Sequence, residues 1–401
     1  MSGPAQGGAA GGSRPGGALA AAASAAFVLF AFVLPGTIAP MGIGMALCGG
    51  LTLAAVTTKR LRWPVTPVNL PALGWLAALV LAATFAVDRG ASFARLGKGF
   101  MPFIVSLAAL HAANRRTGER ALAAYLAASG LVAAIGLGLW VAHGASFDSR
   151  ARGLSGHYMT FAGQLLLEVP VALGVALLAK DRRWRWGAAA VAAVGIVALA
   201  ATFTRSAWIG LLVAGGVILG AIAPLGLAVL AVAAVAAWFL APGAYGERLR
   251  SMFDPANKWN AERVRMWDAG LRMFRDHPLT GVGLQDLHAL YDRYRSPAAT
   301  ERVGHLHNVI VQIAATMGVA GLAAFTWLYG SLVSAAAAGL RPLVQRRGLA
   351  AGLKLGVLAA LAGFLVAGFF EWNFGDEELL YPLFTLVGLA WAATGWDEDA
   401  A

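Results

Sequence analysis

The sequence is poor in charged residues and in cysteine. Asp, Glu, Lys and Arg together make up 13% of the 401 residues, about half of the share found in soluble domains. The single cysteine, Cys48, lies in an apolar run and has no partner for an intrachain disulfide. No cysteines and histidines have the spacing of a zinc site, and no nucleotide-binding glycine pattern is present. These absences exclude an ordinary soluble fold, a disulfide-stapled domain and a nucleotide-dependent enzyme.

Long apolar runs dominate the sequence. Hydrophobic residues make up 59% of the chain, and runs of about 17–25 residues are long enough to cross a bilayer core of roughly 30 Å. The runs lack period-two alternation, so they indicate helices and not the strands of a barrel. We therefore predict an all-α polytopic membrane protein with about twelve transmembrane helices. The predicted spans are 18–34, 37–56, 71–87, 97–113, 121–142, 158–179, 187–203, 207–222, 225–241, 307–338, 350–370 and 378–395.

The positive charges predict the orientation of these spans. A net charge of +11 is compatible with nucleic-acid binding, but most of the charges lie in short loops, so we expect no nucleic-acid partner. With the N-terminus inside, the cytoplasmic side holds 15 Lys and Arg residues, namely Arg14, Lys59, Arg60, Arg62, Arg115, Arg116, Arg120, Lys180, Arg182, Arg183, Arg185, Arg341, Arg346, Arg347 and Lys354. The short outside connections hold six, namely Arg89, Arg95, Lys98, Arg150, Arg152 and Arg205. The positive-inside rule then predicts a bacterial inner-membrane protein with cytoplasmic tails at 1–17, which is Gly-rich and disordered, and at 396–401.

One long connection, residues 242–306, separates the predicted transmembrane helices of 18–241 from those of 307–395. It carries ten Lys and Arg, eight Asp and Glu and three His residues, and a loop of this length is usually functional. From Asn260 to Phe274, apolar residues recur at helical spacing, with Val264, Trp267, Leu271 and Phe274 on one side. We predict this helix, a stop at His277-Pro278, and a second helix over Leu284–Tyr294. The loop should form a helical cap on the periplasmic side, between transmembrane helices nine and ten.

Two clusters in this part of the chain are candidates for anion binding. Arg205 lies in Thr202-Phe-Thr-Arg-Ser-Ala-Trp208, and an arginine at the hydrocarbon boundary is costly and suggests function, although it can instead extend to lipid headgroups. Arg265 follows Arg263 on the predicted cap helix, with Arg272 on the same helix. Arg265 either faces the membrane as an anion ligand or is a solvated partner of Asp268.

The third cluster, His305-Leu-His-Asn308, directly precedes an apolar run. The positive end of a helix dipole disfavours protonated imidazole, so His307 there should be neutral and able to accept a proton; the alternative is a histidine that only caps the span. Arg150, Arg152 and His157 border Gly153-Leu-Ser-Gly156 in an outside loop and either contact a polyanion or are simply exposed. Glu168 lies in the middle of a span and must face the bundle interior.

Three stretches in order resemble the O-antigen ligase and polymerase superfamily. They are Thr204-Arg205-Ser206, then Arg265-Met-Trp267 with His277-Pro278 and Gly281-Val-Gly283, and finally His307-Asn308 at the start of a span. The long outside loop also precedes the His-Asn span, as in that superfamily. The resemblance covers residues 150–320 best and implies a GT-C-like membrane glycosyltransferase.

The resemblance to O-antigen ligases implies transfer of a glycan from undecaprenyl pyrophosphate to a sugar hydroxyl of lipid A-core at the periplasmic face. The catalytic residues would be His307 as base and Arg205 and Arg265 as ligands of the pyrophosphate. Further substrate-binding candidates are Asn308, Arg152, His305, Arg263 and Arg272. The first outside loop, Pro35-Gly-Thr-Ile-Ala-Pro40, contains no acid, so we expect neither a metal nor a cofactor, with arginines in place of a cation.

Related activities remain as alternatives. An O-antigen polymerase and a protein O-oligosaccharyltransferase share the motifs and the donor, and the compact length with one 65-residue loop favours the ligase. A transporter of a lipid-linked anion would need polar residues through the midplane, where Glu168 is nearly alone.

Overall fold

The computed structural model describes residues 15–396. In this part of the chain every regular element is a helix, which confirms the all-α fold. The predicted tail at 1–17 and the predicted tail at 396–401 lie almost entirely outside the described residues. The bundle consists of α1 (Pro15–Val33), α2 (Ile38–Thr57), α3 (Asn69–Thr84), α4 (Arg89–Phe93), η1 (Leu96–Phe103), α5 (Ile104–Ala112), α6 (Arg115–Ala142), α7 (Tyr158–Leu178), α8 (Arg182–Ala201), α9 (Arg205–Ile222), α10 (Gly226–Leu240), α14 (Val309–Ala337), α15 (Leu340–Arg346), α16 (Leu349–Gly368), η2 (Asn373–Gly375), α17 (Glu377–Ala392) and η3 (Ala393–Gly395).

Each of the twelve predicted spans overlaps a helix of the bundle. Among residues 15–396, nine helices are long and apolar enough to cross a membrane, or ten if α10 and the following α11, which meet at a bend of 110°, count as one span. Helices α1 and α3 are shorter apolar helices. The chain is thus a multi-pass membrane protein, while the count of twelve stays a prediction.

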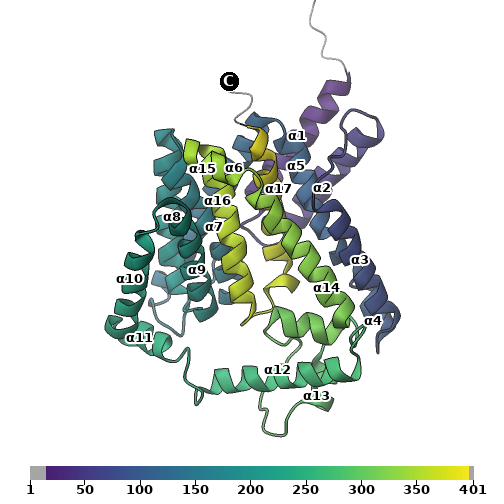
Figure 1. Ribbon diagram of the computed structural model, residues 1–401, viewed down its shortest axis with the longest axis vertical. Coiled ribbons are helices and arrows are strands. Elements are labelled where there is room, and N and C mark those ends of the chain that lie inside the picture. Colours follow the sequence, from purple (N-terminus) through teal and green to yellow (C-terminus); the bar gives the residue numbers. More distant parts are fainter. Residues whose placement is uncertain (1–14, 397–401) are drawn as a thin grey trace, which may run out of the picture.

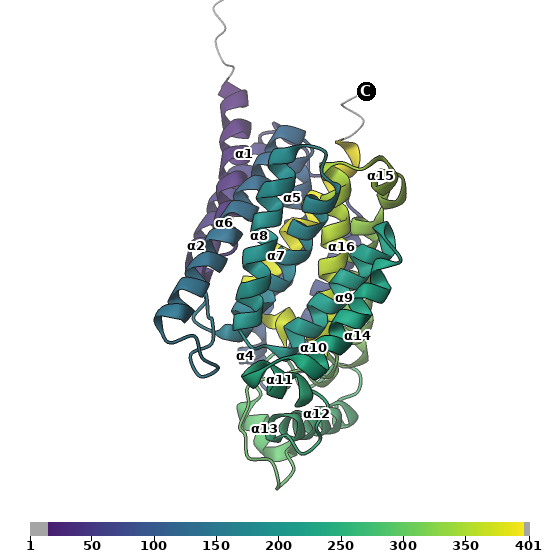
Figure 2. The ribbon, with the colours of Figure 1, turned by 90° about the vertical axis from the view of Figure 1, so that its left-hand side faces the viewer.

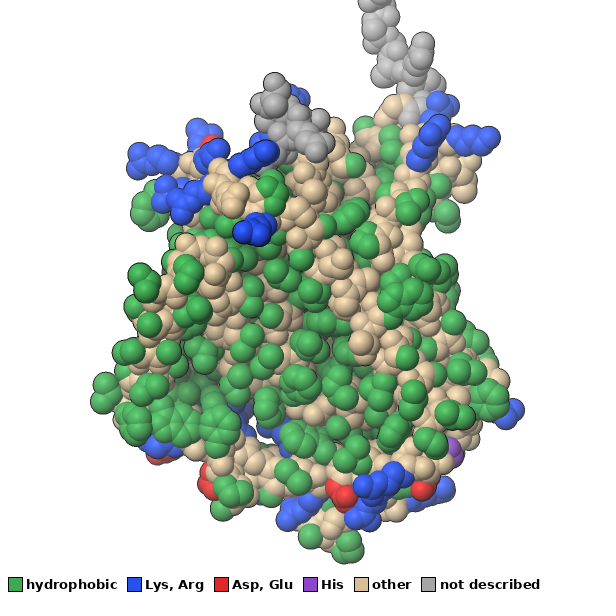
Figure 3. Space-filling view, viewed as in Figure 1, with side chains coloured by type: hydrophobic (Ala, Val, Ile, Leu, Met, Phe, Trp, Pro, Cys, Tyr) green, Lys and Arg blue, Asp and Glu red, His purple; other side chains and the backbone are tan. Residues whose placement is uncertain are grey.

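The bundle has two different ends (Figures 1 and 2). We call the end where residues 15 and 396 lie the terminal face, and the opposite end, covered by α11 (Gly243–Arg250), α12 (Lys258–Asp276) and α13 (His288–Tyr294), the capped face. Figure 3 shows a belt of hydrophobic side chains between them, with Lys and Arg gathered at the terminal face and mixed charges at the capped face. Lys354, which we counted among the charges of the cytoplasmic side, is buried in α16 and donates to the Ala390 carbonyl.

Glycines allow the central helices to approach closely. A Cβ on Gly174 of α7 would lie 2.3 Å from the Gly352 carbonyl oxygen of α16, and one on Gly210 of α9 would lie 2.7 Å from the Gly363 carbonyl oxygen. Small residues at such crossings are typical of helix packing in membranes. Helix α16 is therefore held tightly between α7 and α9, and its capped end is fixed in place.

The cap consists mainly of α12, which lies across the capped face (Figure 1). The helix contains the predicted segment from Asn260 to Phe274 and extends two residues beyond it at each end. Its buried residues include Met266, Ala269 and Met273, while Val264 and Leu271 are 59% and 44% exposed. The predicted second helix, Leu284–Tyr294, is shorter in the structure, where it begins at His288, whose N–H donates to Oδ1 of Asp286 at 2.9 Å.

The segment His277-Pro-Leu-Thr-Gly-Val-Gly283 packs its backbone into a kink of α14. At Gly318 the backbone of α14 is not helical, with φ +62°. There the Val319 N–H donates to the Pro278 carbonyl, and the Val282 N–H donates to the Ala315 carbonyl. A Cβ on Gly281 would lie 2.2 Å from the Thr316 carbonyl carbon, which explains the need for glycine. This motif thus fixes the first turns of α14 against the cap.

Candidate active site

A histidine–carboxylate pair lies at the capped face, where α14 begins and α16 has ended. The Nδ1 of His307 is 3.0 Å from Oε1 of Glu371 and 3.1 Å from Oε2. Both side chains are mostly shielded from solvent, with 23% and 18% of their surfaces exposed. Since Nδ1 faces an acceptor, it carries the proton in the neutral ring, and Nε2 is left with a lone pair.

The local backbone explains how these two residues meet. Asn308 caps α14, because its Oδ1 accepts from the N–H groups of Ile310 and Val311. Its Nδ2 donates to the Phe369 carbonyl, two residues before Glu371, so one side chain ties the two segments together. His307 itself has φ +47°, an uncommon value for a non-glycine residue, which turns its side chain out of the helix.

Burial and neighbouring charges act on the groups around this pair. Burial raises the pKa of the Glu371 carboxyl, but the hydrogen bond with His307 and the nearby positive charges outweigh it, so the pKa is lowered overall. Glu371 is therefore ionised at neutral pH. Burial lowers the pKa of His305, and His307 lowers it further; the two imidazole rings are 4.2 Å apart between centroids. His305 is therefore neutral.

Four arginines converge beside His307 in what we call the arginine pocket, which is lined by Arg150, Arg205, Arg248 and Arg263 and has a volume of about 200 Å³. Among the ion pairs of residues 15–396, none involves any of these four guanidinium groups. Glu262 and Glu301 also line the pocket, but they pair with Arg265 and Lys258, so the four guanidinium groups are suited to a phosphate or pyrophosphate.

A larger cavity, which we call the central cavity, adjoins the arginine pocket. It has a volume of about 560 Å³ and is lined by His305, His307 and Glu371 together with residues of α7, α9 and the segment after α16. His307 lines both spaces. Figure 3 shows a hollow between the bundle and the rim of the cap, with Lys or Arg side chains inside it. The histidine thus lies where an anion held by the arginines would meet a second molecule in the cavity.

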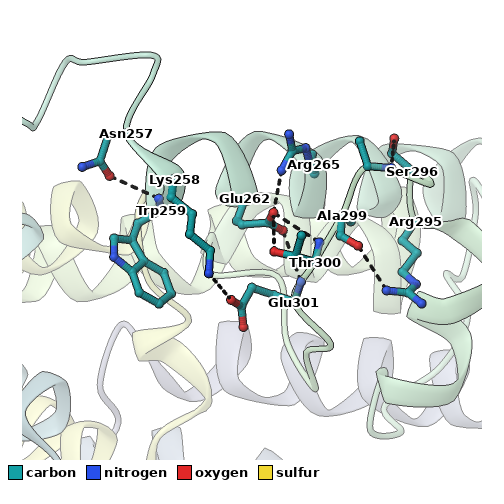
Figure 4. Close-up of polar contacts among 11 residues, drawn as sticks. Asn257, Lys258, Trp259, Glu262, Arg265, Arg295, Ser296, Ala299, Thr300 and Glu301 are labelled. Carbon is teal, nitrogen blue, oxygen red and sulfur yellow. Dashed lines mark hydrogen bonds and ion pairs between the residues drawn. The ribbon is translucent and has the colours of Figure 1, made fainter.

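Several predicted site residues lie elsewhere. Arg265 lines neither space; its guanidinium forms an ion pair of 2.5 Å with Glu262, whose carboxylate also accepts from Thr300 (Figure 4). The alternative partner, Asp268, pairs instead with Arg272 at 2.8 Å. Helix α12 therefore presents Arg263 to the bundle and turns Arg265 and Arg272 aside. Arg152 is exposed and lines neither space.

Arg205 and Asn308 have structural partners at the site. Arg205 is 7% exposed and donates to the Ser251 carbonyl at 2.7 Å and to Asn260 Oδ1 at 2.8 Å, so it joins α9 to α11 and α12 while it borders the pocket. Asn308 is the helix cap described above and lines neither space. Glu168 is buried in α7 beside Gly195 of α8 and also lines neither space.

Sequence reasoning missed Glu371 and Arg248. A carboxylate directly after an apolar run that ends on the same side as His307 was the available signal for Glu371. Arg150, which we had grouped with Arg152 as a weak candidate, lies in the pocket, where its guanidinium is 4.3 Å from the ring centroid of Tyr158. For Arg248, in an eight-residue helix, the sequence offers no distinguishing signal.

One group of side chains has a geometry that can accept a metal ion. Ligand atoms of His305, His307 and Glu371 all lie within 4.8 Å of one another, and two imidazoles with one carboxylate are suitable donors for a divalent transition metal. The same geometry equally suits a base oriented by a carboxylate, in which Glu371 holds the ring and Nε2 accepts a proton.

Comparison with known proteins bears on the same region. No curated protein matches the chain. A family model described as O-antigen ligase matches residues 188–326, which run from α8 into α14 and include Arg205, all of α12 and His307. Residues 188–326 are therefore similar to the O-antigen ligase family.

Proposed function

We propose that this protein is an O-antigen ligase, which transfers O-antigen polysaccharide from undecaprenyl pyrophosphate to a sugar hydroxyl of lipid A-core in lipopolysaccharide biosynthesis. The observation that carries the proposal is the position of His307, held by Glu371 on one side and bordering the arginine pocket on the other. A base and an anion site next to each other are what transfer from a pyrophosphate to a hydroxyl requires.

The reaction is a single displacement at the anomeric carbon of the donor sugar. The acceptor hydroxyl oxygen forms a bond to that carbon while the bond to the pyrophosphate oxygen breaks, and the hydroxyl proton passes to Nε2 of His307. The products are the glycosylated acceptor and undecaprenyl pyrophosphate, with inversion at the anomeric carbon. Glu371 stabilises the imidazolium that forms, as the carboxylate does in other histidine–acid pairs.

The arginine pocket would stabilise the leaving group without a metal. Negative charge grows on the pyrophosphate as the bond breaks, and guanidinium groups that are already in position stabilise it without reorganising. Arg150, Arg248 and Arg263 take this role together with Arg205. We keep Arg265 as a residue that supports the cap through Glu262 and places Arg263.

We propose that the protein lies in the bacterial inner membrane with its terminal face in the cytoplasm and its capped face in the periplasm. The excess of Lys and Arg in the short loops of the terminal face supports this orientation. A donor that carries its own activating pyrophosphate and a lipid-bound acceptor can both reach a site at the outer leaflet.

Polymerase and protein O-oligosaccharyltransferase activities share the donor and remain alternative functions. The lipopolysaccharide of a deletion strain separates them. The ligase proposal expects core without O-antigen and glycan accumulating on undecaprenyl pyrophosphate, both reversed by the wild-type gene. Core that carries a single repeat would instead identify a polymerase, and unchanged lipopolysaccharide with unglycosylated proteins would identify a protein transferase.

A further inference from the structure

A third space, which we call the amide pocket, lies on the side of His305 away from the arginine pocket. It has a volume of about 340 Å³ and lies between α3, η1, the first turns of α14 and the start of α17. It shares Lys98, His305, Trp372 and Gly375 with the central cavity, and it has no lining residue in common with the arginine pocket. The volume falls within the range of about 300–1,000 Å³ typical of small-ligand sites.

Two buried amides line the amide pocket in a fixed orientation. Gln285 and Gln312 are 7% and 4% exposed. The Oε1 of Gln285 accepts from the Asp88 N–H at 2.8 Å, and that of Gln312 accepts from the Leu306 N–H at 2.7 Å. Because a backbone N–H needs an acceptor, each amide has only one possible assignment. Within residues 15–396, neither Nε2 has a hydrogen-bond partner, so both donors are left for a ligand.

The charge of the amide pocket has one sign. Arg95 and Lys98 line it, and no Asp or Glu does, although Lys98 also reaches Glu377 at 3.2 Å on the side of the central cavity. The Nδ1 of His305 is buried without a partner. The wall opposite is aromatic, with Trp372 and Phe374 among its residues. Donors, cations and flat apolar rings together are suited to a sugar ring that carries an anionic group.

The order of the three spaces indicates which substrate this sugar belongs to. The arginine pocket adjoins His307, the central cavity follows, and the amide pocket begins at His305. In a displacement reaction the attacking hydroxyl approaches from the side opposite to the leaving pyrophosphate. A donor held by the arginines therefore leaves the amide pocket to the acceptor.

We propose that the amide pocket binds a carboxylated or phosphorylated sugar of the acceptor, next to the sugar whose hydroxyl is glycosylated. This inference rests on the proposed ligase function and adds to it a site for the acceptor. Gln285 and Gln312 would recognise oxygen atoms of that sugar, and Arg95 with Lys98 would attract its charge.

The test uses two substitutions at Gln285 in the full-length protein. Gln285→Glu keeps the oxygen that accepts from Asp88 but replaces the donor with a negative charge, and Gln285→Met removes the amide without adding charge. The matched control is Gln345→Glu, an exposed residue of α15 at the terminal face. Transfer is measured with undecaprenyl-pyrophosphate-linked glycan and purified lipid A-core, each varied in turn, together with equilibrium binding of fluorescently labelled lipid A-core.

We expect Gln285→Glu to raise the acceptor KM and Kd at least tenfold and Gln285→Met to raise them less, with the donor KM and the control unchanged. A loss of this size corresponds to one lost hydrogen bond in a shielded site together with repulsion of the anion. If the variants raise the donor KM instead, or change neither constant, the inference is wrong. Wild-type protein that binds lipid A-core but transfers nothing would refute the proposed ligase activity and leave the binding result standing.

Two further measurements identify the anion and guard against misfolding. Lipid A-core treated with phosphatase should bind the wild type more weakly if the anion is a phosphate, and equally well if it is a carboxylate. Trp372→Leu alters the aromatic wall at a half-buried position and should raise the acceptor Kd severalfold. Should both Gln285 variants unfold in detergent, an unchanged acceptor Kd in this third variant would by itself overturn the inference.

Discussion

Glu371→Gln is the substitution that most directly probes the proposed base. The carboxylate accepts from Nδ1 of His307 at 3.0 Å and from the Trp372 N–H at 3.0 Å. Gln keeps the size of the side chain and can still accept from the backbone, but it removes the negative charge. The glutamine can also present its NH₂ group to Nδ1 of His307, which would move the ring proton to Nε2. Nε2 would then have no lone pair to take the proton of the attacking sugar hydroxyl.

The expected effect follows from the charge on the imidazolium in the transition state. With the charge centres about 4 Å apart and an effective dielectric constant near 20, their attraction is about 4 kcal/mol. Losing all of it would slow the reaction about 10³-fold. A neutral hydrogen bond recovers part of the loss, so we expect kcat to fall about 10²–10³-fold, with the KM of donor and acceptor within about a factor of three.

Steady-state transfer and thermal unfolding in detergent together test this expectation. The control is Glu119→Gln, which removes an ion pair of 2.8 Å with Arg115 at the terminal face and should leave kcat unchanged. Both variants should unfold within a few degrees of the wild type. A Glu371→Gln variant with more than a third of wild-type kcat would refute the role of this carboxylate, and a loss of kcat matched by a loss of folded protein would show that Glu371 is only structural.

Three other predictions concern the arginines, the metal and the orientation. Arg263→Lys and Arg150→Lys should each lower kcat/KM at least tenfold, because an ammonium cannot reproduce the planar guanidinium fork. The control Arg275→Lys, at an exposed position near the end of the same helix as Arg263, should retain activity. Equal losses in all three variants would contradict the assignment of Arg263 and Arg150 to the arginine pocket. Transfer should continue in excess chelator, and activity lost there but restored by magnesium or manganese would assign an ion to the capped face. A cysteine at Ala298 should react with an impermeant maleimide in intact spheroplasts and one at Thr58 only after lysis, and the opposite pattern would reverse the proposed orientation.

The fold could be predicted well from the sequence because a long apolar run without period-two alternation can cross a bilayer only as a helix. The length and continuity of the apolar runs, together with the positions of the charged residues, were enough to locate a helix in each predicted span. The kink of α14 at Gly318 was not predicted. It depends on hydrogen bonds between the backbone of residues 278–283 and that of α14, and the hydrophobic periodicity of one segment does not reveal its contacts with another. The second cap helix was predicted over Leu284–Tyr294, but in the structure it is limited to His288–Tyr294.

The face of α12 shows why amphipathic patterns mislead next to a membrane. We placed Val264, Trp267, Leu271 and Phe274 on one side of the helix, and we left open whether Arg265, on the other side, faces the membrane as an anion ligand or pairs with Asp268. The structure buries Met266, Ala269 and Met273 and leaves Val264 and Leu271 exposed. Beside a bilayer an exposed apolar residue costs little, so hydrophobicity does not distinguish the side that packs against protein from the side that faces lipid.

Only one residue of the proposed catalytic pair could be predicted from the sequence, because the two residues lie far apart in the chain. His307 could be found because it begins a span next to an asparagine, a local pattern. Glu371 is 64 residues away and meets His307 only because α14 begins and α16 ends at the capped face and Asn308 donates to the Phe369 carbonyl. A rule based on topology would have found it, namely that an acid directly following an apolar run on the side of a candidate base is a candidate partner for that base. If the rule is widened to acids directly before an apolar run, it also selects Asp376, which precedes α17 at the capped face, lines the central cavity and accepts from Thr160 of α7. The rule therefore limits the search to a few acids, and only the distances between side chains identify Glu371 as the partner of His307.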